Sequence, residues 1–223
     1  MIVKEQLLID DMFIYQDTDL YRFTSDAILL SRFATAKKDG VVADLCSGSG
    51  IVGIHFFALN KQKVSKVHLF EMQKPLYDLS IKTITDNNLA EKVIAHNIKI
   101  QDIGQEFNGK FSLVTCNPPY FKSGAILSKE LPEHINVCRE EITVTLGDIC
   151  AVAKRLLTHG GKFCLVHRAD RLSEVLVTLT KNKLEPKKLQ FVCGGKNVPY
   201  LVLIEAVKGA ESGVTVLPNL TNA

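Results

Sequence analysis

The chain contains no tryptophan, and no apolar run approaches the roughly 18 residues that a membrane-spanning helix needs. Its six cysteines form no Cys-x-x-Cys pair, and no histidines cluster at the spacing of a zinc site. The first residues lack the basic-then-apolar pattern of a secretion signal. These absences predict no membrane association, no metal, free buried thiols and a cytoplasmic location.

Strand-like and helix-like segments alternate along the 223 residues, of which 46% are hydrophobic. This alternation predicts an α/β fold with a seven-stranded, mostly parallel sheet, one antiparallel edge strand and helices on both faces. Gly194 to Asn197 joins the last two strands as a hairpin, and His159-Gly160-Gly161 ends the fourth helix as a glycine stop. The expected strands are 41–45, 64–70, 92–97, 111–116, 161–167, 187–193 and 199–207, and the expected helices are 25–36, 51–60, 73–88, 143–158 and 169–182.

We expect a single domain over residues 1–208. Within it, a helical lead of about 40 residues precedes the first strand of the sheet. Residues 209–223 are rich in small and polar side chains, which predicts a loosely ordered tail.

The most informative motif is Asn117-Pro118-Pro119-Tyr120, directly after the expected strand 111–116. Each proline lacks an N–H group, so the carbonyls of Asn117 and Pro118 are free to accept hydrogen bonds from a ligand. An amide, two prolines and an aromatic ring suit a planar, nitrogen-bearing group. The alternative is that Pro-Pro only terminates the strand.

A glycine loop follows the expected strand 41–45. Gly48, Gly50 and Gly53 match G-x-G-x-x-G between a strand and a helix, which predicts a nucleotide-like cofactor without separating a dinucleotide from S-adenosylmethionine. Glu71 ends the next strand, where an acid accepts hydrogen bonds from ribose hydroxyls or is simply solvated. The strand ends therefore converge on one crevice at the carboxyl edge of the sheet.

These motifs, in this order, resemble a family. Together with Tyr21 to Leu30, Arg139-Glu140-Glu141 and Val202 to Glu205, they resemble the bacterial tRNA1(Val) (adenine-37-N6)-methyltransferase family, from about Phe13 to Gly209. The resemblance implies a Rossmann-like class I methyltransferase that uses S-adenosylmethionine. Its implied substrate is RNA, adenine-37 in the anticodon loop of tRNA(Val), a single-stranded site whose bases can be splayed out.

The resemblance also implies roles for individual residues. The Asn117 side-chain oxygen and the Pro118 carbonyl would accept the two hydrogens of the adenine amine, so that rate comes from positioning. Tyr120 would stack on the base, with Phe121 as a second wall or a core residue, and Arg139 would bind a phosphate or pair with a neighbouring acid. The implied catalytic residues are Asn117, Pro118, Pro119 and Tyr120, and the implied substrate contacts are Tyr120, Phe121 and Arg139.

For the cofactor, Asp44 would order the glycine loop or reach toward the methionine end, and Glu71 would hold the ribose. Asn97 would hydrogen-bond the adenine or act as a turn residue. Thr24 and Asp26 would pack over the pocket, although helix capping explains them equally well. The full implied cofactor set is Thr24, Asp26, Asp44, Cys46, Gly48, Gly50, Glu71, Asn97 and Asn117.

The net charge is +3, and the excess of positive charge lies in the second half of the chain. Basic groups there, which favour phosphate contacts but are also common on a solvated surface, are His167-Arg168 with Arg171, Lys181 with Lys183, and Lys187-Lys188.

Other functions remain open. Release-factor methyltransferases share the Asn-Pro-Pro-Tyr motif and act on a glutamine amide, but they typically carry an extra helical domain, and only about 40 residues precede Asp44 here. An adenine in another RNA or in DNA is a further possible substrate. A dehydrogenase leaves Asn117 to Tyr120 unexplained, and a non-catalytic RNA-binding module predicts a degenerate glycine loop, whereas this loop is intact.

Overall fold

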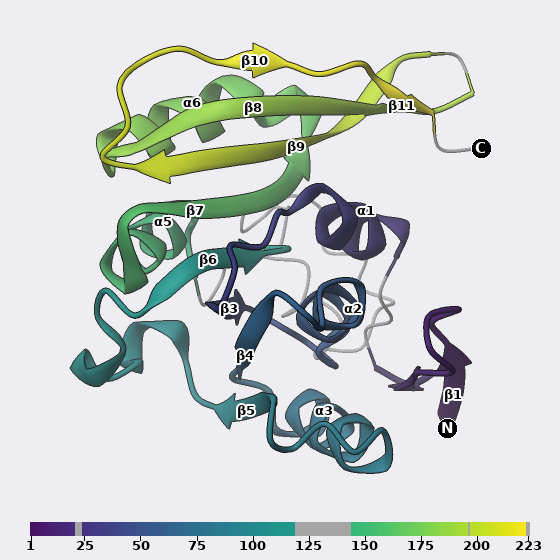
Figure 1. Ribbon diagram of the computed structural model, residues 1–223. Coiled ribbons are helices and arrows are strands. Elements are labelled where there is room, and N and C mark those ends of the chain that lie inside the picture. The colour runs from purple at the N-terminus through teal and green to yellow at the C-terminus, as the bar shows by residue number, and fades with distance from the viewer. Residues whose placement is uncertain (21–23, 119–143, 196, 222–223) are drawn as a thin grey trace.

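The computed structural model describes residues 1–20, 24–118, 144–195 and 197–221, and these form a mixed sheet with helices on both faces (Figure 1). The nine-stranded sheet has the order β10-β8-β9-β7-β6-β3-β4-β5, and β11 also pairs with β8. The strands are β3 (Gly40–Leu45), β4 (Val64–Glu71), β5 (Val93–Asn97), β6 (Phe111–Cys116), β7 (Leu157–Arg168), β8 (Leu184–Cys193), β9 (Pro199–Lys208), β10 (Thr215–Val216) and β11 (Leu220–Thr221).

The central strands are buried on both faces, which is why their sequences are nearly continuous apolar runs. β3 pairs in parallel with β4 and β6, β4 with β5, and β6 with β7. The fold class predicted from the sequence is therefore confirmed, but the sheet has nine strands among the described residues rather than the expected seven, because β10 and β11 in the tail also pair with β8. The antiparallel strand, β9, is not the outermost one: it lies between β7 and β8 and runs against both.

Two layers of helices cover the sheet. In Figure 1, α1, α2 and α3 lie on one side and α5 and α6 on the other, and each side has its own apolar core. α5 begins with a capping box, in which Thr145 Oγ1 accepts from the Asp148 backbone N–H at 3.1 Å. The helices are α1 (Ser25–Phe33), α2 (Ile51–Leu59), α3 (Lys74–Asp86), α5 (Leu146–Leu156) and α6 (Leu172–Lys181), with short 3-10 turns η1 (Ile100–Asp102), η2 (Gln105–Phe107) and η3 (Ala169–Arg171).

The amino-terminal lead is mostly not helical. β1 (Ile2–Gln6) and β2 (Phe13–Asp17) form an antiparallel hairpin ahead of α1. Side chains in α3 and directly after it bind the backbone of β2: Thr83 Oγ1 accepts from the Tyr15 N–H at 3.0 Å, and Oδ1 of Asn87, the residue that caps the helix, accepts from the Phe13 N–H at 3.1 Å. These bonds satisfy backbone groups that an edge strand would otherwise expose, which explains how the hairpin is held.

Two further expectations differ from the structure. The fourth predicted helix ends at Leu156 rather than at the glycines, because Leu157 already pairs with Phe111 and Gly160-Gly161 falls in the irregular start of β7. The expected loose tail instead runs along β8, where Leu217 N–H donates to the Leu189 carbonyl at 2.8 Å. The open backbone edge of β8 supplies the partners that the tail's composition does not reveal.

A buried carboxylate ties three strands and a helix end together. Glu205 on β9 is 3% exposed and lies 3.0 Å from Lys162 Nζ on β7 and 3.1 Å from Lys188 Nζ on β8. Thr35, just after α1, donates to Glu205 Oε2 at 3.4 Å and accepts from Lys162 at 2.7 Å. Both lysines are about one third exposed, so they can turn to water when the carboxylate is removed.

Glu205→Leu should lower the free energy of unfolding by about 3 kcal/mol, at the low end for a broken buried ion pair because the lysines reach solvent. The triple variant Glu205→Leu, Lys162→Met, Lys188→Met should recover most of that loss, since no charge is then left without its partner. Urea denaturation of both variants checks this expectation. An equal loss in both variants would show that packing, not charge pairing, is what Glu205 contributes.

Rings form a cluster on the η2 side of the sheet. His68 and His96 stack with centroids 5.2 Å apart, and His68 Nδ1 lies 2.9 Å from His96 Nε2. Three phenylalanines, Phe70, Phe107 and Phe111, surround the pair. Burial, then the charge of His96, then that of Lys66, lowers the pKa of His68 to about 4. The cluster therefore stabilises the neutral imidazole.

A histidine with a depressed pKa contributes stability that is present above its ordinary pKa of 6.5 and is lost as pH falls toward about 4. We expect the free energy of unfolding to fall over that window. His68→Phe, which keeps a ring in the cluster, should reduce the slope, whereas the exposed His159→Gln should not. Denaturant titrations at several pH values measure the slopes, and parallel curves for wild type and His68→Phe would contradict the expectation.

Candidate active site

The side chains singled out by sequence lie along one edge of the sheet. Asp44 is the second-last residue of β3, Glu71 is the last residue of β4, Asn97 is the last residue of β5, and Asn117 directly follows β6. Because these four strands are parallel neighbours, their carboxyl ends meet at the same edge. The convergence of these side chains on one edge, predicted from the motifs, is thus present in the fold, at the point where β3 pairs with β4 on one side and with β6 on the other.

The glycine loop makes a tight turn into α2. Cys46, Gly48 and Gly50 all have positive φ, at 53°, 57° and 90°, and Gly50 is the residue before the helix. A Cβ atom at Gly53 would collide with Leu69, so this glycine allows α2 to pack on β4. At Gly48 a Cβ would meet no atom within 4 Å. The loop therefore presents open backbone at Gly48, as a close-bound ligand requires.

Asp44, on the strand before the glycine loop, binds groups on both sides of it. Its buried carboxylate accepts from the Gly53 N–H at 3.0 Å and from the Thr115 hydroxyl at 2.7 Å. Gly53 lies in the first turn of α2 and Thr115 on β6, so these bonds tie the start of the helix after the glycine loop to the strands β3 and β6. Burial raises the pKa of Asp44 to about 7, against the opposing effect of its two hydrogen bonds.

Glu71 supports the loop from the neighbouring strand. One carboxylate oxygen accepts from the Gly48 N–H and the other from the Gln73 N–H, both at 2.8 Å. Burial raises the pKa of Glu71 in spite of these bonds. Each carboxylate oxygen has more than one lone pair, so the group retains acceptor capacity for hydroxyl groups.

Asn97 is exposed, and its side-chain amide donates to the carbonyls of Glu71 and Met72 at 3.0 and 3.1 Å. The donor of this amide therefore holds the end of β5 against the end of β4. Cys46 is half-buried, and its thiol interacts with the buried Cys116, whose pKa is raised by burial and by that contact. The described cysteines are free thiols.

Sequence reasoning missed Ser47. It is 5% exposed, and among the described residues its Oγ has no hydrogen-bond partner. A buried hydroxyl without a partner is costly unless a ligand or water satisfies it. Its place in the glycine loop, between Cys46 and Gly48, was the available signal. The orphaned hydroxyl and the open backbone at Gly48 both fit a bound cofactor.

Thr24 and Asp26 begin α1, which packs against α2. Thr24 is the residue before the helix but makes no side-chain capping bond, so the capping explanation fails for it. Asp26 is buried at 5% exposure. The two helices are joined by Ser31 Oγ and His55 Nδ1, 2.6 Å apart, and burial lowers the pKa of His55 to about 4.

The tetrapeptide is described only in part. Asn117 is half-buried and Pro118 is buried directly after β6. Pro119, Tyr120, Phe121 and Arg139 lie outside the described residues. No group of three or more His, Cys, Asp or Glu among the described residues could hold a metal ion. In the same part of the chain, every helix is too short or too polar to cross a membrane.

Several curated proteins are similar to this chain in sequence. A tRNA1(Val) (adenine(37)-N6)-methyltransferase from Histophilus somni is 28% identical over 171 residues, 74% of this chain and 69% of the relative. One of the same name from Cronobacter sakazakii is 25% identical over 69% of this chain, which spans 61% of that relative's length. A release factor glutamine methyltransferase from Mycolicibacterium smegmatis is 28% identical over 61% of this chain and 48% of its own length.

Solved structures show the same fold. A predicted O-methyltransferase from Agrobacterium tumefaciens superposes with a TM-score of 0.68 at 17% identity, over 88% of this chain and 86% of its own. TYW2 from P. horikoshii, solved with MeSAdo, gives a TM-score of 0.65 at 13% identity, over 94% and 72%. The methyltransferase small domain model matches residues 23–184, well over half of the sequence. With the glycine loop, the two strand-end acids and the S-adenosylmethionine-dependent methyltransferase fold in place, this chain belongs to the methyltransferase small domain family.

Proposed function

We propose that the chain, over residues 1–208 as one domain, is an S-adenosylmethionine-dependent N6-adenine methyltransferase that acts on RNA. Its target would be adenine-37 in the anticodon loop of a tRNA(Val), as the names of several relatives indicate for those proteins. The observation that carries the proposal is the position of Asn117 and Pro118, which follow β6 beside the strand ends that bear Asp44 and Glu71. An amine acceptor thus adjoins the loop where a cofactor fits.

The chain's own residues would hold both reactants. Bound S-adenosylmethionine supplies a methyl group on a sulfonium, which is reactive without help from a covalent enzyme intermediate. Gly48 offers open backbone to it, Glu71 offers carboxylate oxygens for hydroxyl groups, and Ser47 offers a hydroxyl without a partner among the described residues. Proximity of this kind lowers a barrier by replacing a bimolecular encounter with a fixed geometry.

Asn117 and Pro118 would orient the adenine amine. The side-chain oxygen of Asn117 and the carbonyl of Pro118 would each accept one N–H, which directs the nitrogen lone pair at the methyl group. Both acceptors also stabilise the positive charge that develops on nitrogen during transfer. Tyr120, outside the described residues, would stack on a base rotated out of the loop.

The glutamine amide of a release factor is the second candidate acceptor, because it also presents a planar NH₂ and because a glutamine methyltransferase is among the relatives. Asn117 and Pro118 would hold either amine in the same way. The test is therefore to offer each substrate separately and compare which one is methylated.

The experiment incubates the protein with radiolabelled S-adenosylmethionine and unmodified tRNA(Val) transcript, a glutamine-containing release-factor fragment or an adenine-containing single-stranded DNA. Nucleoside analysis should find labelled N6-methyladenosine in the tRNA, and the label should be lost when adenine-37 is replaced by guanine. Label on the protein fragment would favour the glutamine acceptor, and label on DNA alone would overturn the RNA assignment.

A further inference from the structure

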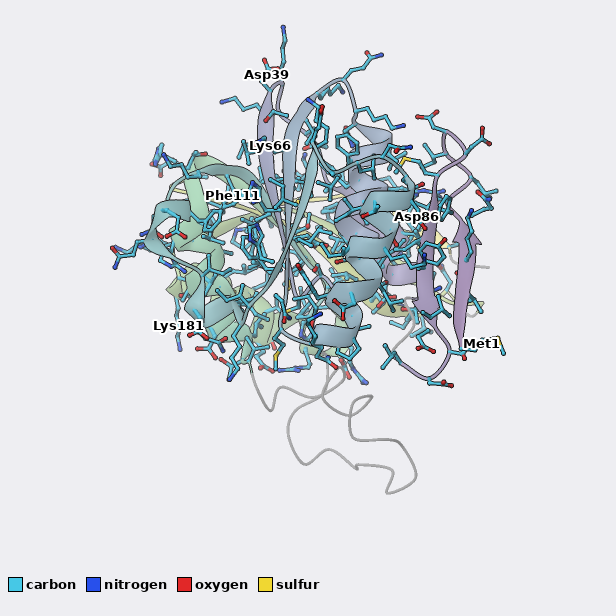
Figure 2. The ribbon with its side chains drawn as sticks, turned by 90° about the horizontal axis from the view of Figure 1, so that it is seen from below. Met1, Asp39, Lys66, Asp86, Phe111 and Lys181 are labelled. Atoms are coloured by element: carbon cyan, nitrogen blue, oxygen red, sulfur yellow. The ribbon has the colours of Figure 1, made fainter. Side chains whose placement is uncertain are left out.

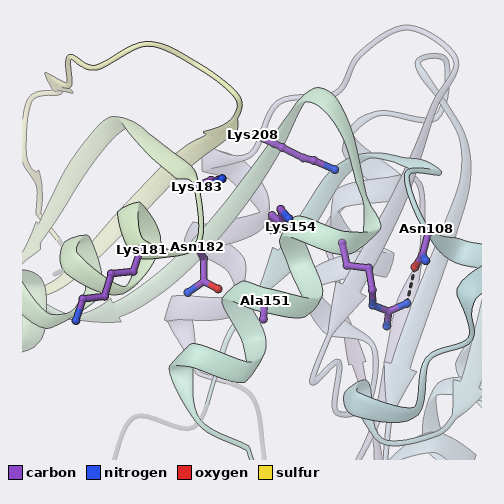
Figure 3. A pocket seen from close by; sticks show the side chains of 8 residues that line it. Asn108, Ala151, Lys154, Lys181, Asn182, Lys183 and Lys208 are labelled. Atoms are coloured by element: carbon purple, nitrogen blue, oxygen red, sulfur yellow. Dashed lines mark hydrogen bonds between the residues drawn. The ribbon is translucent and has the colours of Figure 1, made fainter.

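A pocket lined by positive charge opens at the opposite end of the strands from the candidate active site. It encloses about 500 Å³, and five of its lining residues are cationic: Lys154, Arg155, Lys181, Lys183 and Lys208 (Figure 3). None of the described residues that line it is acidic. A concave surface with a single sign of charge concentrates counter-ions and so favours anionic ligands.

The pocket's place follows from the topology. Lys154 and Arg155 lie in the last turn of α5, which ends directly before β7 begins. Lys181 is the last residue of α6, and Lys183 directly precedes β8. Lys208 ends the antiparallel β9 opposite Leu184. The pocket is therefore at the amino ends of β7 and β8, whereas Asn117 follows the carboxyl end of β6. Figure 2 shows Lys181 on the side of the molecule away from Met1 and Asp86.

Two of the cations are held by neutral groups. Arg155 donates to the carbonyls of Ile103 and Gly104 at 2.9 and 3.3 Å and to Asn108 Oδ1 at 2.5 Å, and Lys208 Nζ donates to the Leu157 carbonyl at 2.6 Å. Partial burial and the charge of Lys154 lower the pKa of Lys208. These contacts position the positive groups without neutralising them, so their mutual repulsion remains for an anion to relieve.

The other three lysines have no carboxylate partner within the described part of the chain: Lys154, Lys181 and Lys183 are exposed and join no ion pair there. The basic residues near the carboxyl end of β7 differ, since Arg168 pairs with Asp170 at 2.5 Å and Arg171 with Glu174 at 2.6 Å. Of the basic groups noted in the sequence, only Lys181 with Lys183 lines the pocket, whereas Lys187 donates to the Glu211 carbonyl and Lys188 pairs with Glu205.

Helix dipoles alone do not account for the pocket. Cations in a last turn stabilise a helix, which explains Lys154 and Lys181. Lys183 lies beyond the end of α6 with φ of +57°, a conformation that glycine or asparagine adopts at lower cost. Lys208 is on a strand. The backbone therefore favours glycine at this position, and the lysine that stands there adds another positive charge to the pocket.

We propose that this pocket binds phosphate groups, and that they belong to the backbone of the RNA substrate at a distance from the nucleotide that is methylated. The identity of the ligand as RNA rests on the proposed function. The anionic chemistry does not, since it follows from the lining residues. Such a contact would raise the affinity for a long folded RNA without touching the reacting base.

The test compares two triple variants. Lys154→Gln, Lys181→Gln, Lys183→Gln removes the three available cations of the pocket. The control Lys38→Gln, Lys63→Gln, Lys92→Gln removes three exposed lysines that directly precede or flank the amino ends of β3, β4 and β5. Figure 2 labels Asp39 and Lys66, the neighbours of these strand starts along the chain. Both triple variants lose the same net charge, so a general electrostatic effect would move both equally.

Fluorescence anisotropy with full-length unmodified tRNA, at salt concentrations from 50 to 250 mM, should give a Kd about tenfold higher for the pocket variant, and a salt slope smaller by about 2 to 3. The KM for tRNA should rise while kcat and S-adenosylmethionine affinity stay unchanged. An isolated anticodon stem-loop should not distinguish the variant from wild type. Equal tRNA binding by wild type and the pocket variant, or equal loss in the control, would overturn the proposal.

Lys183→Gly separates binding from folding. Relief of the positive φ should raise Tm by about 2–4 °C, while tRNA affinity falls. A lysine with only a structural role would change Tm and tRNA affinity in the same direction.

Binding of inorganic tripolyphosphate is measured as well. If tripolyphosphate binds wild type and not the pocket variant while tRNA binding is unaffected, the ligand of the pocket is a free phosphate compound and its assignment to RNA is wrong. If tRNA is bound through the pocket but never methylated, the proposed function is wrong and the phosphate-binding role of the pocket is still supported.

Discussion

Asn117→Ala should lower kcat for methyl transfer about 10²- to 10³-fold, the range found when one preorganised polar contact to a developing charge is removed. The fold should tolerate the change, because Asn117 is half-buried beyond the end of β6 rather than within the sheet. The loss would come from an amine that is held by one acceptor instead of two. Single-turnover rates with radiolabelled S-adenosylmethionine and saturating tRNA measure it.

Two substitutions sharpen this expectation. Asn117→Asp keeps an acceptor oxygen of the same reach, so it should retain at least about tenfold more activity than Asn117→Ala. Asn97→Ala is the matched control: it removes an exposed strand-end amide whose donor binds Glu71 and Met72, and it should raise the KM for S-adenosylmethionine with little change in kcat. Full kcat in Asn117→Ala would remove Asn117 from the reaction.

The parts of the fold that the sequence predicted are those with local signals. The runs that became β3, β4 and β6 are mostly apolar, and a glycine loop, an acid or a proline pair lies at the carboxyl end of each. The hairpin β1–β2 lacks such a signal. Its connection runs through Leu8, Asp10 and Asp11, all with positive φ but without the glycine that usually marks a turn of this kind. β10 and β11 have only two residues each, too few for any periodicity.

Local signals also predicted that the candidate site residues meet at one edge of the sheet, but they did not predict the hydrogen bonds and charges around these residues. The spacing of Gly48, Glu71 and Asn117 is enough to bring them to one edge once the strands are parallel. That Glu71 binds the Gly48 N–H, or that Ser47 Oγ lacks a partner among the described residues, depends on side-chain directions that no local pattern encodes. The basic pocket likewise needs the ends of α5, α6 and β9, which lie far apart in sequence.

Asp44 connects the stability of the fold with the cofactor loop, and its replacement should damage both. Asp44→Ala leaves the buried Gly53 N–H without its acceptor and leaves the Thr115 hydroxyl with only the Ala43 carbonyl, 3.4 Å away. At about 1–3 kcal/mol for an unsatisfied buried group, the free energy of unfolding should fall by about 2–3 kcal/mol. S-adenosylmethionine affinity should fall at least about tenfold, because Gly48 and Gly50 lose the anchor of the turn that holds them.

Asp44→Asn distinguishes the hydrogen bonds from the charge. The pKa of Asp44 is raised to about 7, so the wild-type contribution to stability is full below the ordinary pKa of 3.8 and is lost as pH rises through about 7. Asparagine stays neutral and keeps one acceptor. Its destabilisation relative to wild type should therefore shrink as pH rises from 5 to 8. Urea denaturation at both pH values measures the gap, and a constant gap would show that Asp44 acts only through its two hydrogen bonds.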